Sequence, residues 1–407
     1  MTAERALPGR SGDPLRGRHI VLGVSGSIAC YKAIEVTSRL VQAGAVVDVV
    51  LTKAATEFVT PLAFKAITQR NPYTDMFDPA GPEGEAHVEL ARRADAMLIA
   101  PATAATLARL ATGLAEDFVA LTAIATTAPL LVAPAMDTQM WEHPAVQANV
   151  ATLTERGTHF IGPAAGRLAS GRVGAGRLVE PERIVDELRA RLGREHGDLA
   201  GRRIVVTAGG TREAIDPVRY ISNHSSGKMG YAIAEAARDR GAELTIDSTV
   251  GLAAPAAVRE VPVSSALQMQ AAVHEACADA DALIAAAAVA DYRPAAAADQ
   301  KLKKSAGTAG MAIELVENPH ILGSTPTATS RGTLVKVGFA AETQNLVENA
   351  AAKLKERGAR FIVANDVTAT DAGFGSDDNR VTILDDAGGR EDLPLMTKYA
   401  VGHAILD

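Results

Sequence analysis

Cysteine is scarce in this chain. Among its 407 residues only Cys30 and Cys277 are cysteines, and they lie far apart in the sequence. This number and spacing match neither a zinc-binding motif nor a disulfide framework. Proteins of the reducing cytoplasm typically keep their thiols free. We therefore expect a cytoplasmic protein.

A basic excess and a long hydrophobic run are also missing. The chain has 41 Lys and Arg against 48 Asp and Glu, whereas a DNA-binding protein usually presents a basic face, so we expect no nucleic-acid partner. The longest uncharged Ala/Val run, Ala282–Ala290, is about half a membrane span, so we expect no membrane partner. Residues 1–17 are rich in Arg, Gly and Pro without an apolar centre, which predicts a flexible tail and not a signal peptide.

The first half of the sequence alternates short apolar runs with amphipathic stretches. Helical patterns cover Ile28–Ala43 and His87–Ala94. Continuous apolar runs are typical of parallel strands that are buried on both faces. The alternation predicts a doubly wound α/β sheet. Its strands are expected at His19–Val24, Val46–Leu51, Ala96–Ala100 and Leu130–Ala133.

The second half repeats this logic as a Rossmann-like α/β domain. A charged, glycine-bearing stretch, Arg191–Gly201, separates the two series and predicts a linker between domains 18–190 and 202–407. A helix is expected at Leu395–Ile405, and the helical spacing of Met269 and Val273 predicts core positions. Strands are expected at Arg203–Val206, Glu243–Asp247, Ala282–Ala287, Leu334–Ala340, Arg360–Ala364 and Val381–Leu384.

The stretch Thr207–Tyr231 carries the strongest functional signal. An apolar run breaks into glycines and a polar loop, and Ser225, Ser226, Gly227 and Lys228 then open a helical pattern. Hydroxyls, backbone amides, a helix N-terminus and a lysine all favour one anion, which predicts a phosphate site. It is not a Walker A loop, because Met229 follows where that motif needs Ser or Thr.

Three turns in the first half follow predicted strands, at Gly23–Ala29, Ala100–Ala104 and Ala133–Asp137. Small residues in the first turn would let backbone amides approach a phosphate. Taken alone, such a turn is a weak signal, because most first βα turns favour Gly and Ser. Open α/β sheets bind ligands at the carboxyl ends of their strands, so we expect all three turns to share one site.

The segment Asp216–Gly230 (DPVRYISNHSSGKMG) resembles the signature of phosphopantothenate–cysteine ligase. In many bacteria this ligase is the C-terminal half of a bifunctional coenzyme A biosynthesis protein. The N-terminal half of that protein is a flavodoxin-like, FMN-dependent phosphopantothenoylcysteine decarboxylase. The resemblance extends from about Arg18 to Asp407 and implies both activities, with phosphopantothenate, cysteine and CTP as substrates.

The resemblance implies an FMN site and a histidine that does acid/base work at the substrate thiol. His87 matches that histidine, although a lone His at a helix start is otherwise a cap or surface residue. The implied reaction is redox-neutral: the thiol is oxidised to a thioaldehyde, carbon dioxide leaves, and the enethiolate is reduced again. The implied FMN contacts are Ser25, Gly26 and Ser27 at the phosphate, with Thr52, Pro101, Ala102, Thr103 and Met136 nearby.

Two positions depart from the family pattern. Asp137 stands where relatives carry an Asn that binds the substrate carboxylate, and an aspartate there would repel it unless protonated or reoriented. Ser170 stands where many relatives carry a cysteine implicated in the final reduction. A serine hydroxyl is a much poorer proton donor. The sequence does not say what replaces that cysteine.

For the ligase half, the resemblance implies attack of the carboxylate on the α-phosphate of CTP, followed by attack of cysteine's amine. Asn223 would stabilise the acyl-cytidylate intermediate, and Arg219 and His224 would contact substrate phosphate or carboxylate. Lys301 would neutralise the transferring phosphate, although its basic run also fits a solvated surface, and Asp291 would hold ribose or Mg²⁺. The expected nucleotide pocket also includes Ala287, Ala288, Phe339, Lys353 and Lys355.

Relatives place FMN between the subunits of a trimer, and ligase halves pair as dimers, so the resemblance implies a homo-oligomer, most simply a dodecamer. Two alternatives stay open. A dinucleotide-dependent oxidoreductase would suit two Rossmann-like halves, although neither half shows a G-x-G-x-x-G turn with the expected acidic residue. An impaired or regulatory FMN-binding half beside a working ligase would explain Asp137 and Ser170.

Overall fold

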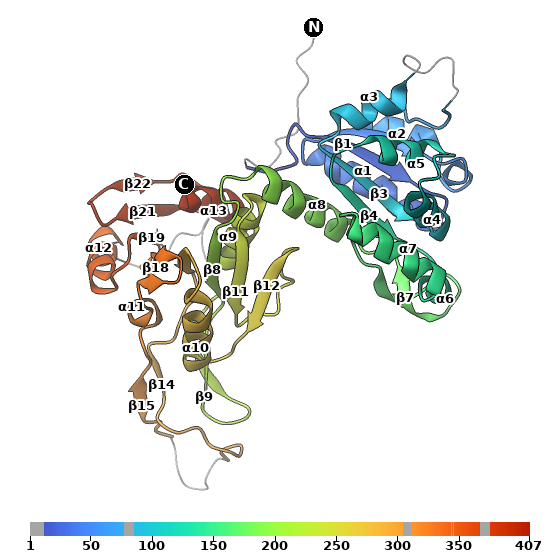
Figure 1. The fold of residues 1–407 in the computed structure, drawn as a ribbon. Helices are drawn as coiled ribbons and strands as arrows, with labels where there is room; N and C mark the ends of the chain where they lie inside the picture. Colours follow the sequence, from blue (N-terminus) through green and yellow to red (C-terminus); the bar gives the residue numbers. More distant parts are fainter. Residues whose placement is uncertain (1–11, 77–84, 304–310, 343, 345, 367–374) are drawn as a thin grey trace. The chain divides into compact units, whose positions relative to one another are not determined.

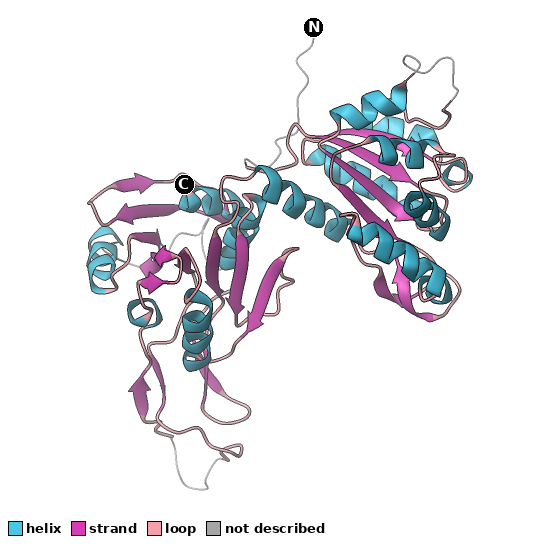
Figure 2. Ribbon diagram, in the orientation of Figure 1, coloured by secondary structure: helices cyan, strands magenta, loops and turns pink. Residues whose placement is uncertain are grey.

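The computed structural model describes residues 12–76, 85–303, 311–342, 344, 346–366 and 375–407. The chain divides into two compact units, Met1–Leu192 and Gly193–Asp407 (Figure 1). Both units are α/β, and helices flank the central sheet of each (Figure 2). Among the described residues, no helix is long and apolar enough to cross a membrane.

The first unit is built on a five-stranded parallel sheet with the order β2-β1-β3-β4-β5. This is the flavodoxin-like order, which confirms the predicted fold of this half. The four predicted strands are all present, and two of them run one or two residues further than predicted. The strands are β1 (His19–Val24), β2 (Val46–Leu51), β3 (Ala96–Ala102), β4 (Leu130–Pro134) and the short β5 (His159–Phe160).

Helices cover both faces of this sheet, because successive strand residues point to opposite sides. Ile20 and Leu22 of β1 pack with α1, α2 and α8, whereas Val21 packs with α3, α4, α5 and α7. The helices are α1 (Cys30–Gln42), α2 (Pro61–Thr68), α3 (Ala86–Arg93), α4 (Ala104–Thr112), α5 (Phe118–Ala125), α6 (Thr138–Trp141), α7 (Pro144–Glu155) and α8 (Pro181–His196), with a 3₁₀ turn η1 (Ala55–Glu57). A hairpin of β6 (Ala164–Arg167) and β7 (Val173–Arg177) precedes α8.

The packed chain begins ahead of the predicted Arg18. Leu15 is fully buried in the core of the first unit. The carboxylate of Asp13 accepts hydrogen bonds from Nε (3.1 Å) and Nη2 (2.9 Å) of Arg189. Residues 13–17 are therefore anchored and do not form the predicted flexible tail, and residues 1–11 lie outside the described part of the chain.

The boundary between the units falls inside α8, within the predicted linker. Residues 191–196 of that linker form the last turns of the helix, and Leu192 still belongs to the first core. The rest of the linker, residues 197–201, is a turn that leads into the second unit.

The second unit contains an eight-stranded sheet with the order β12-β11-β8-β13-β18-β19-β21-β22. Its first six strands are parallel, and their order along the chain is 3-2-1-4-5-6, as in Rossmann folds. β21 and β22 add an antiparallel edge. The strands are β8 (Arg203–Ala208), β11 (Glu243–Ser248), β12 (Val258–Pro262), β13 (Ala282–Ala285), β18 (Val335–Glu342), β19 (Phe361–Asp366), β21 (Val381–Asp385) and β22 (Arg390–Asp392).

Helices also cover both faces of the second sheet. α9 (Lys228–Asp239) and α13 (Lys398–Leu406) pack on one face, and α10 (Ala266–Cys277) and α12 (Leu346–Glu356) on the other. Met269 and Val273 of α10 are fully buried, as predicted. The smaller elements are α11 (Ile321–Ser324) and the hairpins β9 (Arg212–Ala214) with β10 (Tyr220–Ser222), β14 (Tyr292–Pro294) with β15 (Leu315–Glu317), β16 (Ala328–Thr329) with β17 (Gly332–Thr333), and β20 (Asp378–Asn379) with β23 (Met396–Thr397).

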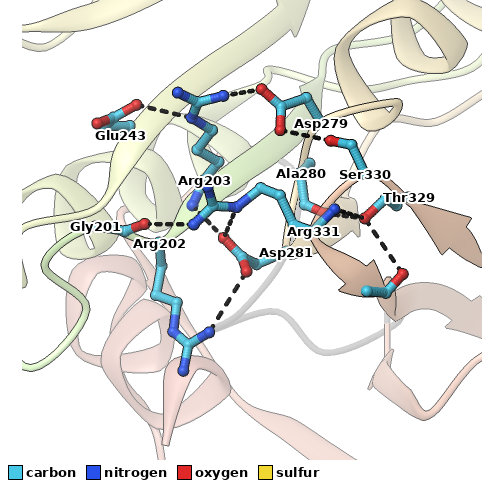
Figure 3. A network of polar contacts seen from close by, with 11 residues as sticks. Gly201, Arg202, Arg203, Glu243, Asp279, Ala280, Asp281, Thr329, Ser330 and Arg331 are labelled. Carbon is cyan, nitrogen blue, oxygen red and sulfur yellow. Dashed lines mark hydrogen bonds and ion pairs between the residues drawn. The ribbon is translucent and has the colours of Figure 1, made fainter.

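A network of charged side chains ties the amino ends of β8 and β13 together (Figure 3). Asp281 accepts hydrogen bonds from the amide of Arg203 at 2.8 Å and from Nε of Arg331 at 2.9 Å. Burial opposes ionisation of Asp281, but these donors outweigh it and lower the pKa of its carboxyl group. The network therefore links the strands at their amino ends, opposite to the carboxyl ends at which the predicted phosphate site lies.

Candidate active sites

The turn after β1 in the first unit is fixed by Ser25. The Ser25 hydroxyl donates to the carbonyl of Pro101 at 2.8 Å and accepts from the amide of Thr103 at 2.9 Å. This links the first predicted turn to the second. Ser25 is buried and both roles of its hydroxyl are filled within the protein, so it shapes the turn.

The next residues of that turn leave backbone donors available. Ser27 Oγ accepts from the amide of Ala29, and no described residue accepts a hydrogen bond from the amides of Gly26 and Ile28. Gly26 lies so close to the chain that an added Cβ would be 2.5 Å from Cβ of Ala54. Unpaired amides directly before α1 are donors of the kind that bind anions, and this donor set fits the phosphate of FMN.

The third predicted turn lies beside the first two. The amide of Ala135 donates to the carbonyl of Ala102 at 3.0 Å, and the amide of Met136 donates to Gly176 of β7 at 2.9 Å. Thr103 caps α4 by accepting from the amide of Thr106. The three turns therefore meet at one edge of the sheet, as expected from their positions after parallel strands.

The hairpin β6–β7 is pressed onto the turn after β4. An added Cβ on Gly176 would lie 2.3 Å from the carbonyl oxygen of Met136, and one on Gly174 would lie 2.5 Å from Oγ1 of Thr138. These two glycines allow this close approach. Gly174 and Gly176 alternate along β7, and this spacing was the sequence signal for the close packing of the hairpin, although it was not predicted.

Asp137 and Ser170 are in direct contact. The Ser170 hydroxyl donates to Oδ2 of Asp137 at 2.6 Å, and Nη1 of Arg172 lies 3.6 Å from Oδ1 of the same carboxylate. The Ser170 hydroxyl, the amide of Gln139 and the Arg172 cation lower the pKa of Asp137 below its usual value. Asp137 is therefore ionised at neutral pH, and an arginine stands beside the charge that would repel a substrate carboxylate.

His87 lies in the first turn of α3. Its ring meets Phe118 edge-on, with 6.5 Å between ring centroids, and Phe118 lies 5.5 Å from the ring of Tyr73. The carbonyl of Tyr73 accepts from the amide of Leu51 at the end of β2. Among the described residues no hydrogen bond joins His87 to Ser25 or Asp137, so the structure of one chain does not bring it into their contact network.

The second unit contains a pocket of about 900 Å³ at the carboxyl ends of β8, β13 and β18. Strand order reverses between β8 and β13, and open α/β sheets bind ligands at such a position. Nine of the predicted residues line it: Asn223, Ser225, Ser226, Gly227, Ala287, Ala288, Asp291, Phe339 and Lys353.

Hydrogen bonds fix the loop that follows β13. The amide of Ala287 donates to Oγ1 of Thr207 at 3.1 Å, and the amide of Ala290 donates to Oγ1 of Thr211 at 3.0 Å. Asn223 Nδ2 donates to the carbonyl of Val289 at 3.0 Å. The loop is thus held against the polar stretch after β8, and Asn223 lies at their junction.

The predicted phosphate site, Ser225–Lys228, leads into α9 as expected from its helical pattern. Gly227 is its N-cap, with a φ of 75°, and an added Cβ would lie 2.5 Å from Cγ2 of Val250. The amide of Gly227 donates to Oγ of Ser225 at 3.3 Å. Only glycine suits this position, because its backbone is left-handed and its surroundings are filled.

Five other predicted residues do not line the pocket: Arg219, His224, Lys228, Lys301 and Lys355. Lys228 Nζ instead contacts Oδ1 of Asp377 at 2.8 Å and the carbonyl of Gly375 at 2.9 Å. Arg219 forms an ion pair with Asp216. The partners of Lys228 are about 150 residues away in the sequence, and the partner of Arg219 lies in the same turn. The sequence alone therefore did not indicate these contacts.

One wall of the pocket was not predicted from the sequence. It is lined by Asn318, His320, Arg357, Asn379 and Lys398. Asn318 Nδ2 donates to the carbonyl of Ala290 at 2.8 Å. Burial lowers the pKa of His320, with Arg357 adding to the effect. The available signal was a polar Asn-Pro-His sequence directly after the short β15.

Comparisons with known proteins agree with this division. A family model described as Flavoprotein matches residues 8–193, and one described as the DNA/pantothenate metabolism flavoprotein C-terminal domain matches residues 199–407. The coenzyme A biosynthesis bifunctional protein CoaBC of Vibrio parahaemolyticus is 46% identical over 394 residues, covering 97% of this chain and 98% of the relative. The chain belongs to this family.

A second curated relative gives the same result. The CoaBC protein of Bacillus subtilis is 45% identical over 395 residues, covering 96% of each chain. A crystal structure of the C-terminal domain of CoaBC is 42% identical, with a TM-score of 0.42, and covers 51% of this chain and 92% of that chain. The protein is a bifunctional enzyme of coenzyme A biosynthesis, with an FMN-dependent decarboxylase half and a ligase half, and the oxidoreductase alternative is wrong.

Proposed function

We propose that the pocket of the second unit is where the carboxylate of phosphopantothenate is activated by CTP and then joined to cysteine. The observation that carries this is one pocket of about 900 Å³ with a helix N-terminus on one side and a polar loop on the other. The Ser225–Gly227 segment before α9 suits the substrate phosphate. Asn223 lies between the two and suits the acyl-cytidylate.

Asp291 is the proposed protein contact for Mg²⁺. No described group of three or more acidic, His or Cys side chains could hold a metal by itself. The exposed Asp291 carboxylate makes no ion pair with another described residue and faces the pocket. One carboxylate fits Mg²⁺, because this ion keeps several waters and binds substrate phosphates in such sites.

In the first unit, we propose that the three turns hold FMN and that Asp137, Ser170 and Arg172 handle the substrate. Bound FMN supplies the acceptor and donor of the hydride in a reaction with no net oxidation. Arg172 offers a cation to the carboxylate that leaves as carbon dioxide. Ser170 is the proton donor nearest to Asp137, and His87 supplies acid/base chemistry at the thiol.

A product assay tests both halves together. Purified protein is supplied with phosphopantothenate, cysteine, CTP and Mg²⁺, and the products are identified by mass spectrometry. Phosphopantetheine as the sole product is expected. Accumulation of phosphopantothenoylcysteine would show an impaired or regulatory flavin half, and absence of any CTP-dependent product would contradict the ligase assignment. ATP in place of CTP, and EDTA in place of Mg²⁺, are the matched controls.

We also propose a dodecamer of decarboxylase trimers and ligase dimers, since two closed interfaces in one chain lead to a large closed assembly. Apolar side chains exposed on the first unit support an interface there, with Ile28, Tyr31 and Leu62 each more than 60% exposed. Light scattering should give a mass of about 500 kDa, twelve times the 42.2 kDa chain. A monomer mass would contradict the proposal.

A further inference from the structure

The turn at the tip of the β9–β10 hairpin holds a segment that lies some 80 residues further along the chain. The turn comprises residues 215–219, and the segment comprises residues 298–302. The amide of Ala298 donates to the carbonyl of Ile215 at 2.9 Å. The segment contains Lys301, the lysine expected to neutralise the transferring phosphate, so this attachment bears on the ligase reaction.

Asp216 is the centre of the attachment. Its side chain is fully buried, although it lies in an exposed hairpin. Oδ1 accepts from the amides of Val218 and Arg219, both at 2.8 Å, which closes the turn. Oδ2 accepts from Nε of Arg219 at 3.0 Å and from the amide of Leu302 at 3.1 Å.

Arg219 completes the attachment from the other side. Its Nη2 donates to the carbonyl of Leu302 at 2.7 Å. Both backbone polar groups of Leu302 are therefore bound to one ion pair, and bonds to charged groups are about twice as strong as neutral ones. Since Leu302 follows Lys301 directly, the backbone from which the Lys301 side chain extends is fixed.

We infer that Asp216 and Arg219 are positioning residues that fix Lys301 for formation of the acyl-cytidylate. This rests on the proposed ligase function and on the role that the family resemblance implies for Lys301, since Lys301 does not itself line the pocket. It also revises the role expected for Arg219, because its guanidinium is occupied by Asp216 and Leu302 and does not line the pocket. A lysine on an unfixed segment would spend less time near the α-phosphate, so attachment should raise the rate of the first step.

A double-mutant cycle tests the coupling to Lys301. Pyrophosphate release is measured in a single turnover with CTP, Mg²⁺ and phosphopantothenate, for wild type, Arg219→Ala, Lys301→Ala and the double variant. Arg219→Ala should slow release on the order of 10-fold to 100-fold, and should add little when Lys301 is already absent. Losses that multiply would show that Arg219 acts independently of Lys301, and a higher KM for phosphopantothenate at unchanged kcat in steady-state assays would show that Arg219 contacts the substrate. Either result would overturn the inference.

Limited trypsin digestion gives a readout that does not depend on turnover. Arg219→Ala and Asp216→Ala should be cleaved faster after Lys301 and Lys303 at an unchanged melting temperature. Arg212→Ala is the matched control, because Arg212 lies in the same hairpin, over the ring of Tyr220 at 5.3 Å, and should leave cleavage as in wild type. Unchanged cleavage in all three variants would contradict the attachment.

The two proposals fail differently. If wild type releases no pyrophosphate with CTP, the ligase assignment fails, whereas faster trypsin cleavage would still show the attachment. If Arg219→Ala does not fold, Arg219→Lys replaces it in both assays, because lysine keeps the charge but cannot bridge Asp216 and Leu302 with a planar fork.

Discussion

At the scale of residues, Asp137 and Ser170 form one hydrogen-bonded pair. The sequence presents them as two separate departures from the family pattern, 33 positions apart. The hydroxyl–carboxylate bond of 2.6 Å joins them, and Arg172 lies beside the pair. The proton of the Ser170 hydroxyl lies in its hydrogen bond to Asp137 and can pass to a substrate only when that bond breaks, so the pair differs chemically from either residue alone.

Replacing Ser170 by Ala should slow decarboxylation on the order of 100-fold, because the proton donor is lost. Binding of FMN should not change, since Ser170 lies outside the phosphate turn. The rate of phosphopantetheine formation from supplied phosphopantothenoylcysteine measures the effect. Ser170→Cys, which restores a more acidic donor, should keep at least the wild-type rate. If Ser170→Ala is as fast as wild type, Ser170 is not the donor.

Asp247 should make the free energy of unfolding depend on pH. Its carboxylate is fully buried in β11 and neither oxygen has a hydrogen-bond partner among the described residues. Burial, with a contribution from Glu275, raises the pKa of Asp247 to about 7. Because the pKa of Asp247 is higher in the folded state than in the unfolded state, its contribution to the free energy of unfolding is complete below about pH 4. This contribution is lost as the pH rises through about 7.

Asp247→Asn should therefore gain stability relative to wild type as the pH rises between those values, by up to about 4 kcal/mol. The reason is that the amide cannot ionise. Urea unfolding of both proteins across this range measures the difference in the free energy of unfolding. A difference that does not change with pH would contradict the raised pKa.

At the scale of elements, the turn between β1 and α1 depends on a glycine. Gly26→Ala would place Cβ 2.5 Å from Ala54, so the turn must shift. We expect loss of bound FMN, seen as loss of visible flavin absorbance, with CTP-dependent ligation retained. Gly113→Ala is the control: alanine is strained at its φ of 76°, but nothing lies within 4 Å of an added Cβ. Retained flavin in Gly26→Ala would show that the turn does not bind FMN.

Most strands could be predicted because buried parallel strands read as continuous apolar runs. The strand expected at Ala282–Ala287 was predicted two residues too long. Ala286 and Ala287 leave the sheet and enter the pocket loop, and the sequence does not show this because alanine suits both a strand and a loop. The short hairpins were not predicted, because their pairing is between distant segments and leaves little local pattern. Nine predicted ligase residues do line one pocket, whereas the partners of Lys228 and Arg219 depend on tertiary folding.

At the scale of the whole molecule, two sheets with different strand orders each carry one site at the carboxyl ends of their strands. The order is 2-1-3-4-5 in the first unit and 3-2-1-4-5-6 over the parallel part of the second. Each sheet has its own core and its own helices on both faces. The two reactions can therefore be separated by substitution.

Asn223→Ala should reduce ligation on the order of 100-fold, because it removes the amide at the junction of the two pocket walls. Decarboxylation of supplied phosphopantothenoylcysteine should stay at the wild-type rate. The two rates are measured separately on one preparation. An equal loss of both would mean that the halves depend on each other for activity.

The chain's two cysteines are divided between the units, Cys30 in the first and Cys277 in the second, and both are buried. Burial raises the pKa of both thiols, that of Cys277 to about 12, so a thiol reagent should modify neither in the native protein. Each becomes reactive only when its own unit opens. Alkylation at increasing urea concentrations, followed by peptide mapping, would thus show which half unfolds first without an engineered label.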